Sequence, residues 1–308
     1  MTIKTAALIG LGAIGSYIAG NLENVLGDDL RVIASGRRAE KLNEEGRIIN
    51  GKQQFFHIVD PAEETGPADL AIVITKMPQL REALESMRNQ IGPKTVIMTP
   101  LNGVDSENVA AEVYGSERVI YSLARTSAVK EDNRISFNPA RAFLEFGEKY
   151  SETPSERVLA VKELFESAGI GCVLKNDMVR AIWEKFVCNV SENPVSAVLG
   201  IPFGAWGASE HANFLRVKTG EEVIKIAHAK GIEIDDDYCK EHVESLKKQP
   251  YTNKASTLQD IENGRHTEID MFCGTILRLG KELGIETPYS EFLYHAVRVL
   301  EEKNDGKI

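Results

Sequence analysis

A glycine-rich segment near the amino terminus constrains the fold more than any other feature of this 308-residue chain. The apolar run Ala6–Ile9 predicts a buried strand, and helical periodicity extends from about residue 12 to residue 25. Between the two lies Gly10-Leu11-Gly12-Ala13-Ile14-Gly15. The first glycine of this pattern allows a tight turn, the second lets backbone approach a pyrophosphate, and the third lets the helix pack against the strand. The segment therefore predicts a dinucleotide-binding strand–turn–helix unit, in preference to a glycine turn without a ligand.

Short apolar runs alternate with helical stretches through the first half of the chain. Further strands are predicted at residues 31–34, 70–74, 95–98 and 119–122. Continuous apolar runs of this length are typical of a parallel sheet covered on both faces, and the alternation predicts right-handed βαβ units. Residues 134–137 and 142–146 are expected to form an antiparallel pair that extends the sheet, and residues 169–174 are the last predicted strand.

From about Asn176 onward the chain shows only helical periodicity. One apolar stripe contains Val179, Ile182, Trp183, Phe186, Val187 and Val190. We therefore predict an α/β protein with a Rossmann-type, doubly wound, mainly parallel sheet in residues 1–175 and an all-helical domain in residues 176–308. The apolar stripes of the helical domain are compatible with a homodimer, although no residue specifies one.

Charge and composition exclude several classes of partner. The formal net charge of −10 disfavours binding to a nucleic acid backbone. No apolar run approaches the ~20 residues that span a bilayer, and no signal-peptide pattern opens the chain, so no membrane partner is expected. The four cysteines lack a C-x-x-C pair, which favours free thiols in a reducing compartment. A cytoplasmic protein is expected.

The residues after the predicted strands indicate which dinucleotide is bound. Ser35-Gly36-Arg37-Arg38 follows the second strand and lacks the acid that NAD-selective sites usually place there. Arg37 suits a 2′-phosphate, so NADPH is the predicted cofactor, and a solvated helix start is the alternative. Lys76 follows the next predicted strand and is a second phosphate candidate or an exposed loop lysine. Asn102 is either a nicotinamide neighbour or part of an Asn-Gly turn.

Two polar clusters in the helical half are candidates for catalysis. Lys185, Asn189 and Asn193 have i, i+4, i+8 spacing, which puts them on one helix face beside the apolar stripe. Asparagine is a poor helix former, so two of them at this spacing indicate a function, and a lysine that snorkels from a core helix is the alternative for Lys185. The second cluster contains Asn253, Ser256 and, before a predicted helix, Glu268, which can also be a charge favoured by the helix dipole. His266, Glu268 and Asp270 have no matching ligand pair elsewhere, so no metal is expected.

Taken together, these segments resemble the ketopantoate reductase (2-dehydropantoate 2-reductase) family over nearly the whole chain. The resemblance rests on the glycine turn, Lys76, residues 101–103, Trp183-Glu184-Lys185, Asn189, Asn193-Pro194, and residues 256–270. It implies a Rossmann domain, an all-helical carboxyl-terminal domain and NADPH-dependent reduction of ketopantoate to D-pantoate, a step toward pantothenate and coenzyme A. The partner that it implies is a small 2-oxo acid.

The resemblance also assigns roles to individual residues. Lys185 corresponds to the general acid and Glu268 to a carboxylate that contacts the substrate hydroxyl. The other implied roles are substrate binding by Asn189, Asn193, Asn253 and Ser256, nicotinamide contact by Asn102, and adenosine phosphate binding by Arg37 and Lys76.

Phe203 departs from the family pattern, because it stands where a substrate-contacting Asn is common. The departure indicates a more apolar substrate, and similar proteins reduce other branched or aromatic 2-oxo acids, some with NADH. A D-2-hydroxy-acid dehydrogenase and a non-catalytic NADP-binding redox sensor therefore remain alternatives. The identity of the 2-oxo acid and the strictness of NADPH over NADH stay open.

Overall fold

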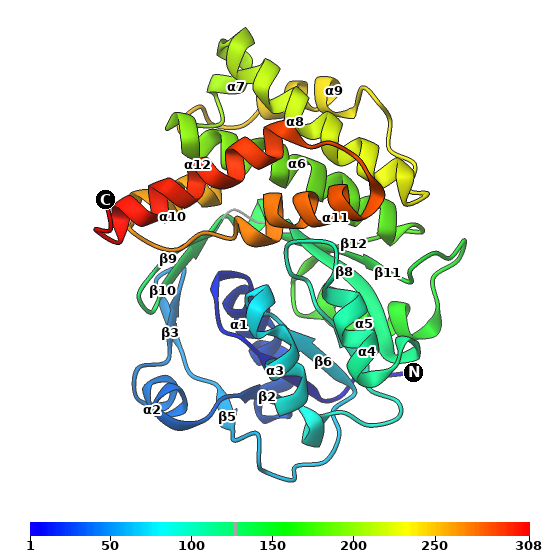
Figure 1. Ribbon diagram of the computed structural model, residues 1–308. Coiled ribbons are helices and arrows are strands. Elements are labelled where there is room, and N and C mark those ends of the chain that lie inside the picture. Colours follow the sequence, from blue (N-terminus) through cyan, green and yellow to red (C-terminus); the bar gives the residue numbers. More distant parts are fainter. Residues whose placement is uncertain (126–127) are drawn as a thin grey trace. The chain divides into compact units, whose positions relative to one another are not determined.

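The computed structural model describes residues 1–125 and 128–308, and the chain forms two compact units, Met1–Val179 and Arg180–Ile308 (Figure 1). We call them unit 1 and unit 2. Unit 1 contains both sheets, and the regular elements described in unit 2 are all helices. The predicted fold class, a mainly parallel doubly wound sheet followed by an all-helical region, is confirmed.

The main sheet of unit 1 has eight strands in the order β12-β11-β8-β7-β6-β1-β2-β5. Neighbours from β5 to β8 pair in parallel, β8 and β11 pair antiparallel, and β11 and β12 pair in parallel. The strands are β1 (Ala6–Ile9), β2 (Leu30–Ile33), β5 (His57–Val59), β6 (Leu70–Val73), β7 (Val96–Met98), β8 (Val119–Arg125), β11 (Phe143–Gly147) and β12 (Gly171–Leu174).

Both faces of this sheet are buried, which explains why its strands are apolar at successive positions. Alternate residues such as Leu8 and Ile72 belong to one core, and Ala7 and Val73 belong to the other. The first core also contains residues of α1 and α5, and the second contains residues of α3 and α4. The helices of unit 1 are α1 (Ala13–Leu26), α2 (Gly36–Glu45), α3 (Leu80–Ser86), α4 (Ser106–Tyr114) and α5 (Glu156–Ser167).

The strand order reverses next to β1. The chain passes from β1 to β2 and β5 on one side, and then to β6, β7 and β8 on the other. The carboxyl ends of β1 and β6 therefore form a topological switch point, where open α/β sheets bind their ligands.

The expected antiparallel pair of residues 134–137 and 142–146 is wrong. Residues Arg134–Phe137 form β10, which belongs to a separate four-stranded sheet of order β4-β3-β10-β9, whereas β11 joins the main sheet. Asp132, with φ +52°, adopts the left-handed conformation in the turn between β9 and β10. This local hairpin, together with the bond from the Asn50 amide to the Ile135 carbonyl (2.9 Å), gives β10 its partners. The other strands of this sheet are β3 (Arg47–Ile49), β4 (Lys52–Gln54) and β9 (Ala128–Glu131).

Unit 2 is built around α6, whose first two residues belong to unit 1. Ile182, Trp183, Phe186, Val187 and Val190 of the predicted apolar stripe are all buried, and this burial explains their spacing. Among the described residues, no helix has both the length and the apolar character needed to cross a membrane. The helical elements are α6 (Met178–Leu199), α7 (Ala205–Ala208), α8 (Glu210–Ala229), α9 (Tyr238–Leu246), α10 (Ser256–Glu262), the π-helical turn η6 (Asp270–Gly274), α11 (Thr275–Leu283) and α12 (Pro288–Asn304).

Candidate active site

Two of the three glycines in the turn after β1, Gly10 and Gly15, are required by contacts within the protein. Gly10 has φ +104°, and a Cβ there would lie 1.9 Å from the Ile74 carbonyl oxygen. A Cβ on Gly15 would lie 1.8 Å from the Gly10 carbonyl oxygen, so only glycine allows α1 to pack this closely on β1. A Cβ on Gly12 would meet nothing within 4 Å. Gly12 therefore borders open space, as a residue facing a pyrophosphate must.

The amino terminus of α1 suits an anion. Its N-cap residue is Gly12, which has no side chain to accept hydrogen bonds from the first amides, and the first turn contains no acid. These amides and the positive end of the helix dipole favour a negatively charged group. Of the other turn residues, Leu11 is buried, whereas Ala13 and Ile14 are partly exposed. The local geometry thus fits the pyrophosphate of a dinucleotide.

The sheet brings the remaining cofactor candidates to one edge. β2, β1, β6 and β7 are neighbours, and Arg37, the glycine turn, Lys76 and Asn102 follow their carboxyl ends in that order. The Ile74 amide donates to the Ile9 carbonyl (2.9 Å), so the segments leading to Gly10 and Lys76 run side by side. Arg37 and Lys76 are exposed, Asn102 is partly buried, and the first turn of α2 has no acid. At this edge of the sheet, two positively charged side chains are exposed, and the first turn of α2 lacks the acid that would bind the ribose of NAD.

Glu107, which the sequence did not single out, is buried behind the segment that carries Asn102. Its carboxyl group lies 2.9 Å from Ser106 Oγ and 3.3 Å from the Ser122 amide, and burial raises the pKa of Glu107 to about 7. Ser106 Oγ also lies 3.1 Å from the Thr99 carbonyl oxygen. A hydroxyl has one proton, so Ser106 can donate either to the ionised Glu107 or to the Thr99 carbonyl oxygen, and both contacts are satisfied only when Glu107 is protonated and donates to Ser106. An acid in the first turn of α4 gave no sequence signal beyond a favourable helix-dipole charge.

In unit 2, a hydrogen-bond chain joins three of the predicted substrate residues. Ser256 Oγ donates to Asn193 Oδ1 (2.9 Å), and Asn193 Nδ2 donates to the Asn189 carbonyl oxygen (3.1 Å). Ser256 is the first residue of α10, whereas Asn189 and Asn193 lie one turn apart on α6. The chain fixes the side chain of Asn193 and ties α10 to the polar face of α6.

The side-chain amide nitrogen of Asn189, Nδ2, takes no part in this series of hydrogen bonds. Its Nδ2 atom is buried and has no hydrogen-bond partner. Lys185, one turn earlier on α6, is partly exposed. A buried amide without an acceptor costs about 1–3 kcal/mol, so such an atom points to a ligand that supplies an oxygen.

Asn253 and Phe203 lie on paired backbone segments. The Phe203 amide donates to the Asn253 carbonyl oxygen (2.7 Å), and the Gly204 amide donates to the Tyr251 carbonyl oxygen (3.0 Å). Both the Asn253 and Phe203 side chains are partly exposed. The residue that departs from the family pattern is thus a direct backbone neighbour of a predicted substrate residue.

Glu268 belongs to a segment held by α12. Glu301 Oε1 accepts from the Thr267 amide and from Thr267 Oγ1, both at 2.7 Å. Asp270 accepts from Tyr294 Oη (2.9 Å) and pairs with Arg298. His266 Nε2 lies 3.2 Å from Asp305 Oδ1. These contacts fix the backbone on both sides of Glu268, whose side chain is partly exposed.

The strand order, the glycine turn and the open anion-binding helix end define the class: a Rossmann-type oxidoreductase that binds a nicotinamide dinucleotide. The family model "Ketopantoate reductase PanE/ApbA" matches residues 6–149, and "Ketopantoate reductase PanE/ApbA C terminal" matches residues 177–301. The chain belongs to the ketopantoate reductase family.

Individual relatives agree with this assignment. A 2-dehydropantoate 2-reductase from Pyrococcus horikoshii is 30% identical, covering 97% of this chain and 98% of the relative. The crystal structure of a 2-dehydropantoate 2-reductase from Geobacter metallireducens is 27% identical, with a TM-score of 0.83 and coverage of 96% and 99%. A D-mandelate dehydrogenase complex with NADH and anilino(oxo)acetate shares the fold, with a TM-score of 0.85, 24% identity and coverage of 98% and 99%.

Proposed function

We propose that this protein reduces a small 2-oxo acid with NADPH, and that ketopantoate is its substrate. The observation that carries the proposal is the buried, unpartnered Asn189 Nδ2 on the same face of α6 as Lys185. A carboxylate or carbonyl oxygen of the substrate would satisfy this donor. The Pyrococcus relative named 2-dehydropantoate 2-reductase supports the same substrate class.

Lys185 is the proposed general acid. Bound NADPH would supply the hydride for the carbonyl carbon, so that negative charge would develop on the carbonyl oxygen. The Lys185 ammonium group stabilises that oxygen and then gives it one proton, which leaves a hydroxy acid and a neutral amine that is reprotonated by water. A donor placed at developing charge is worth about 3–4 kcal/mol, and general acid catalysis about 10²–10⁴ in rate.

The hydrogen bonding of Ser256 favours a substrate that carries a hydroxyl group. Its single proton is directed to Asn193 Oδ1, so Ser256 Oγ has only lone pairs left for a ligand. An ionised Glu268 also offers only acceptors. Either acceptor can take the single proton of the terminal hydroxyl of ketopantoate, whereas a simple branched 2-oxo acid has no donor for either of them.

Cofactor selection rests on the cationic edge of unit 1. Arg37 at the start of α2 would contact the 2′-phosphate, Lys76 would add a second positive charge, and Asn102 would face the nicotinamide. No acid in the first turn of α2 is present to bind an NAD ribose. NADPH is therefore the proposed reductant.

Phe203 favours a second candidate function, that of a D-2-hydroxy-acid dehydrogenase acting on an apolar or aromatic 2-oxo acid. Its partly exposed ring beside Asn253 offers apolar surface where the family commonly has an amide. In that case the acceptors at Ser256 and Glu268 would have no substrate donor.

A matched pair of substrates distinguishes the two functions. Ketopantoate and 3,3-dimethyl-2-oxobutanoate differ only in the terminal hydroxyl, and phenylglyoxylate represents the aromatic class. We expect NADPH consumption with kcat/KM at least ~10-fold higher for ketopantoate than for its deoxy analogue, since the analogue lacks the hydroxyl group that could donate to Ser256 Oγ or to the Glu268 carboxylate. A preference for phenylglyoxylate would favour the second function. No turnover of any 2-oxo acid would overturn both functions and favour a redox sensor.

A further inference from the structure

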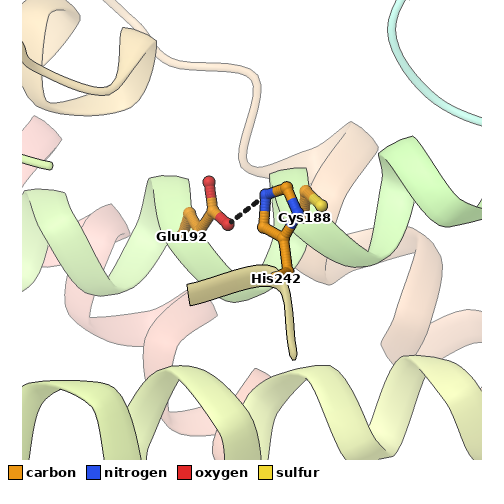
Figure 2. Close-up of side chains that lie close together, drawn as sticks. All are labelled: Cys188, Glu192 and His242. Carbon is orange, nitrogen blue, oxygen red and sulfur yellow. Dashed lines mark ion pairs between the residues drawn. The ribbon is translucent and has the colours of Figure 1, made fainter. Parts of the chain in front are cut away.

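Three side chains of unit 2 with metal-binding chemistry converge on one point, which is formed by residues other than Lys185, Asn189 and Asn193. Cys188 and Glu192 lie one turn apart on α6, and His242 lies on α9 (Figure 2). One potential ligand atom from each residue lies within 4.8 Å of the other two. His242 Nε2 is 3.5 Å from Glu192 Oε1. Two helices thus supply sulfur, nitrogen and oxygen to one small volume.

Glu192 gives independent evidence that this volume accepts a ligand. Its side chain is 7% exposed, and its Oε1 atom is buried and accepts no hydrogen bond. Arg216 Nη1 lies 3.7 Å from Oε1, beyond hydrogen-bond distance. Arg216 directs Nε and Nη2 to Asn213 Oδ1 (3.0 and 2.9 Å) and Nη2 also to the Cys239 carbonyl. Arg216 Nη1 itself is buried without a hydrogen bond, so Arg216 forms an ion pair with Glu192 at 3.7 Å but donates no hydrogen bond to Oε1, which keeps its lone pairs.

The donor set selects the kind of ion. A thiolate, an imidazole and a carboxylate together are typical ligands of Zn²⁺, whereas Mg²⁺ and Ca²⁺ prefer oxygen alone. Thiolate and carboxylate would balance the two charges of the ion. A carboxylate has four lone-pair positions, so Glu192 can bind an ion and still face Arg216.

We propose that Cys188, Glu192 and His242 bind a zinc ion, with water in the fourth position. On binding, the Cys188 thiol releases its proton to solvent and forms the Zn–S bond, and His242 binds through a neutral ring nitrogen. The ion would join α9 to α6 three residues after Lys185, and so stabilise the helix that carries the polar row. This site is independent of the proposed reductase activity.

Direct metal binding tests the site without an activity assay. The full chain, freed of metal with a chelator, is titrated with cobalt(II) chloride and then with zinc chloride. We expect one equivalent of cobalt per chain, a near-ultraviolet band from thiolate-to-cobalt charge transfer, loss of this band on adding zinc, and a higher Tm of the zinc-bound protein.

Matched variants identify the ligands. Cys188→Ser and His242→Gln should each lower zinc affinity by about 100-fold or more, since even residues that only support a metal ligand cost about 10–100-fold. Cys172→Ser, at a partly buried thiol of unit 1, and His211→Gln, at an exposed histidine of α8, are controls that should bind as the parent does. Circular dichroism shows whether each variant is folded. If Cys188→Ser or His242→Gln is unfolded, Glu192→Gln is tested in its place and should also lower zinc affinity. Absence of the charge-transfer band, or equal binding by the ligand and control variants, would overturn the proposal.

Discussion

Replacing the buried Glu107 by glutamine should change how stability depends on pH. Burial raises the pKa of this carboxyl group from 4.5 to about 7, against the hydrogen bonds from Ser106 and Ser122 that favour its ionised form. Below pH ~4.5 the group is protonated in both the folded and unfolded states, so it contributes no pH dependence. Between pH ~4.5 and ~7 the unfolded chain ionises first, and stability falls as pH rises. Above pH ~7 both states are ionised and the loss is complete.

The size of this loss follows from the shift. The rise of the pKa from 4.5 to about 7 corresponds to about 3 kcal/mol of unfolding free energy, and solvent does not screen it because Glu107 is 3% exposed. Glutamine has nearly the shape of the protonated acid, can donate to Ser106 Oγ and can accept from the Ser122 amide. Glu107→Gln should therefore match the parent near pH 4 and be more stable by about 3 kcal/mol near pH 8.

Urea unfolding followed by circular dichroism at several pH values measures this difference. Tryptophan fluorescence is unsuitable, because Trp183 and Trp206 both lie in unit 2 and Glu107 lies in unit 1. Glu112→Gln, on the exposed side of the same helix, is the control and should follow the parent. If the parent and Glu107→Gln profiles remain parallel from pH 5 to pH 8, the Glu107 carboxyl group is not held in its neutral form.

Three further predictions concern the candidate active site. Lys185→Ala should lower kcat by about 10²–10⁴-fold while the Kd for NADPH stays within about 2-fold, as steady-state kinetics and a cofactor titration would show; parent-like turnover would contradict the role of general acid. Arg37→Ala should reduce the NADPH-over-NADH ratio of kcat/KM by about 10–100-fold, whereas Arg88→Ala, before the amino end of β7, should not; an unchanged ratio in both would show that Arg37 is only solvated. Gly12→Val should weaken NADPH binding by more than ~10-fold with little change in Tm, since its side chain would enter open space, and normal binding would place the pyrophosphate elsewhere.

Some errors of the sequence analysis have a common cause. β5 and the small sheet of β3, β4, β9 and β10 were not predicted, and β10 was given the wrong partner. Strand pairing depends on contacts between segments far apart in the chain. The sequence of a four-residue strand such as Arg134–Phe137 does not indicate which strand it pairs with. The roles of Lys185, Arg37 and the other candidate residues, and the homodimer, stay predictions.

The sequence by itself determined the features that arise from local geometry. A glycine between a strand and a helix defines a turn, an apolar stripe of period 3.6 defines the buried face of α6, and i, i+4, i+8 spacing aligns Lys185, Asn189 and Asn193. Only the tertiary structure decided which distant groups meet: Ser256 with Asn193 across 63 residues, His242 with Glu192, and Glu107 with the Ser122 amide. Burial and hydrogen bonding at these points depend on the packing of separate elements, and no local pattern in the chain encodes them.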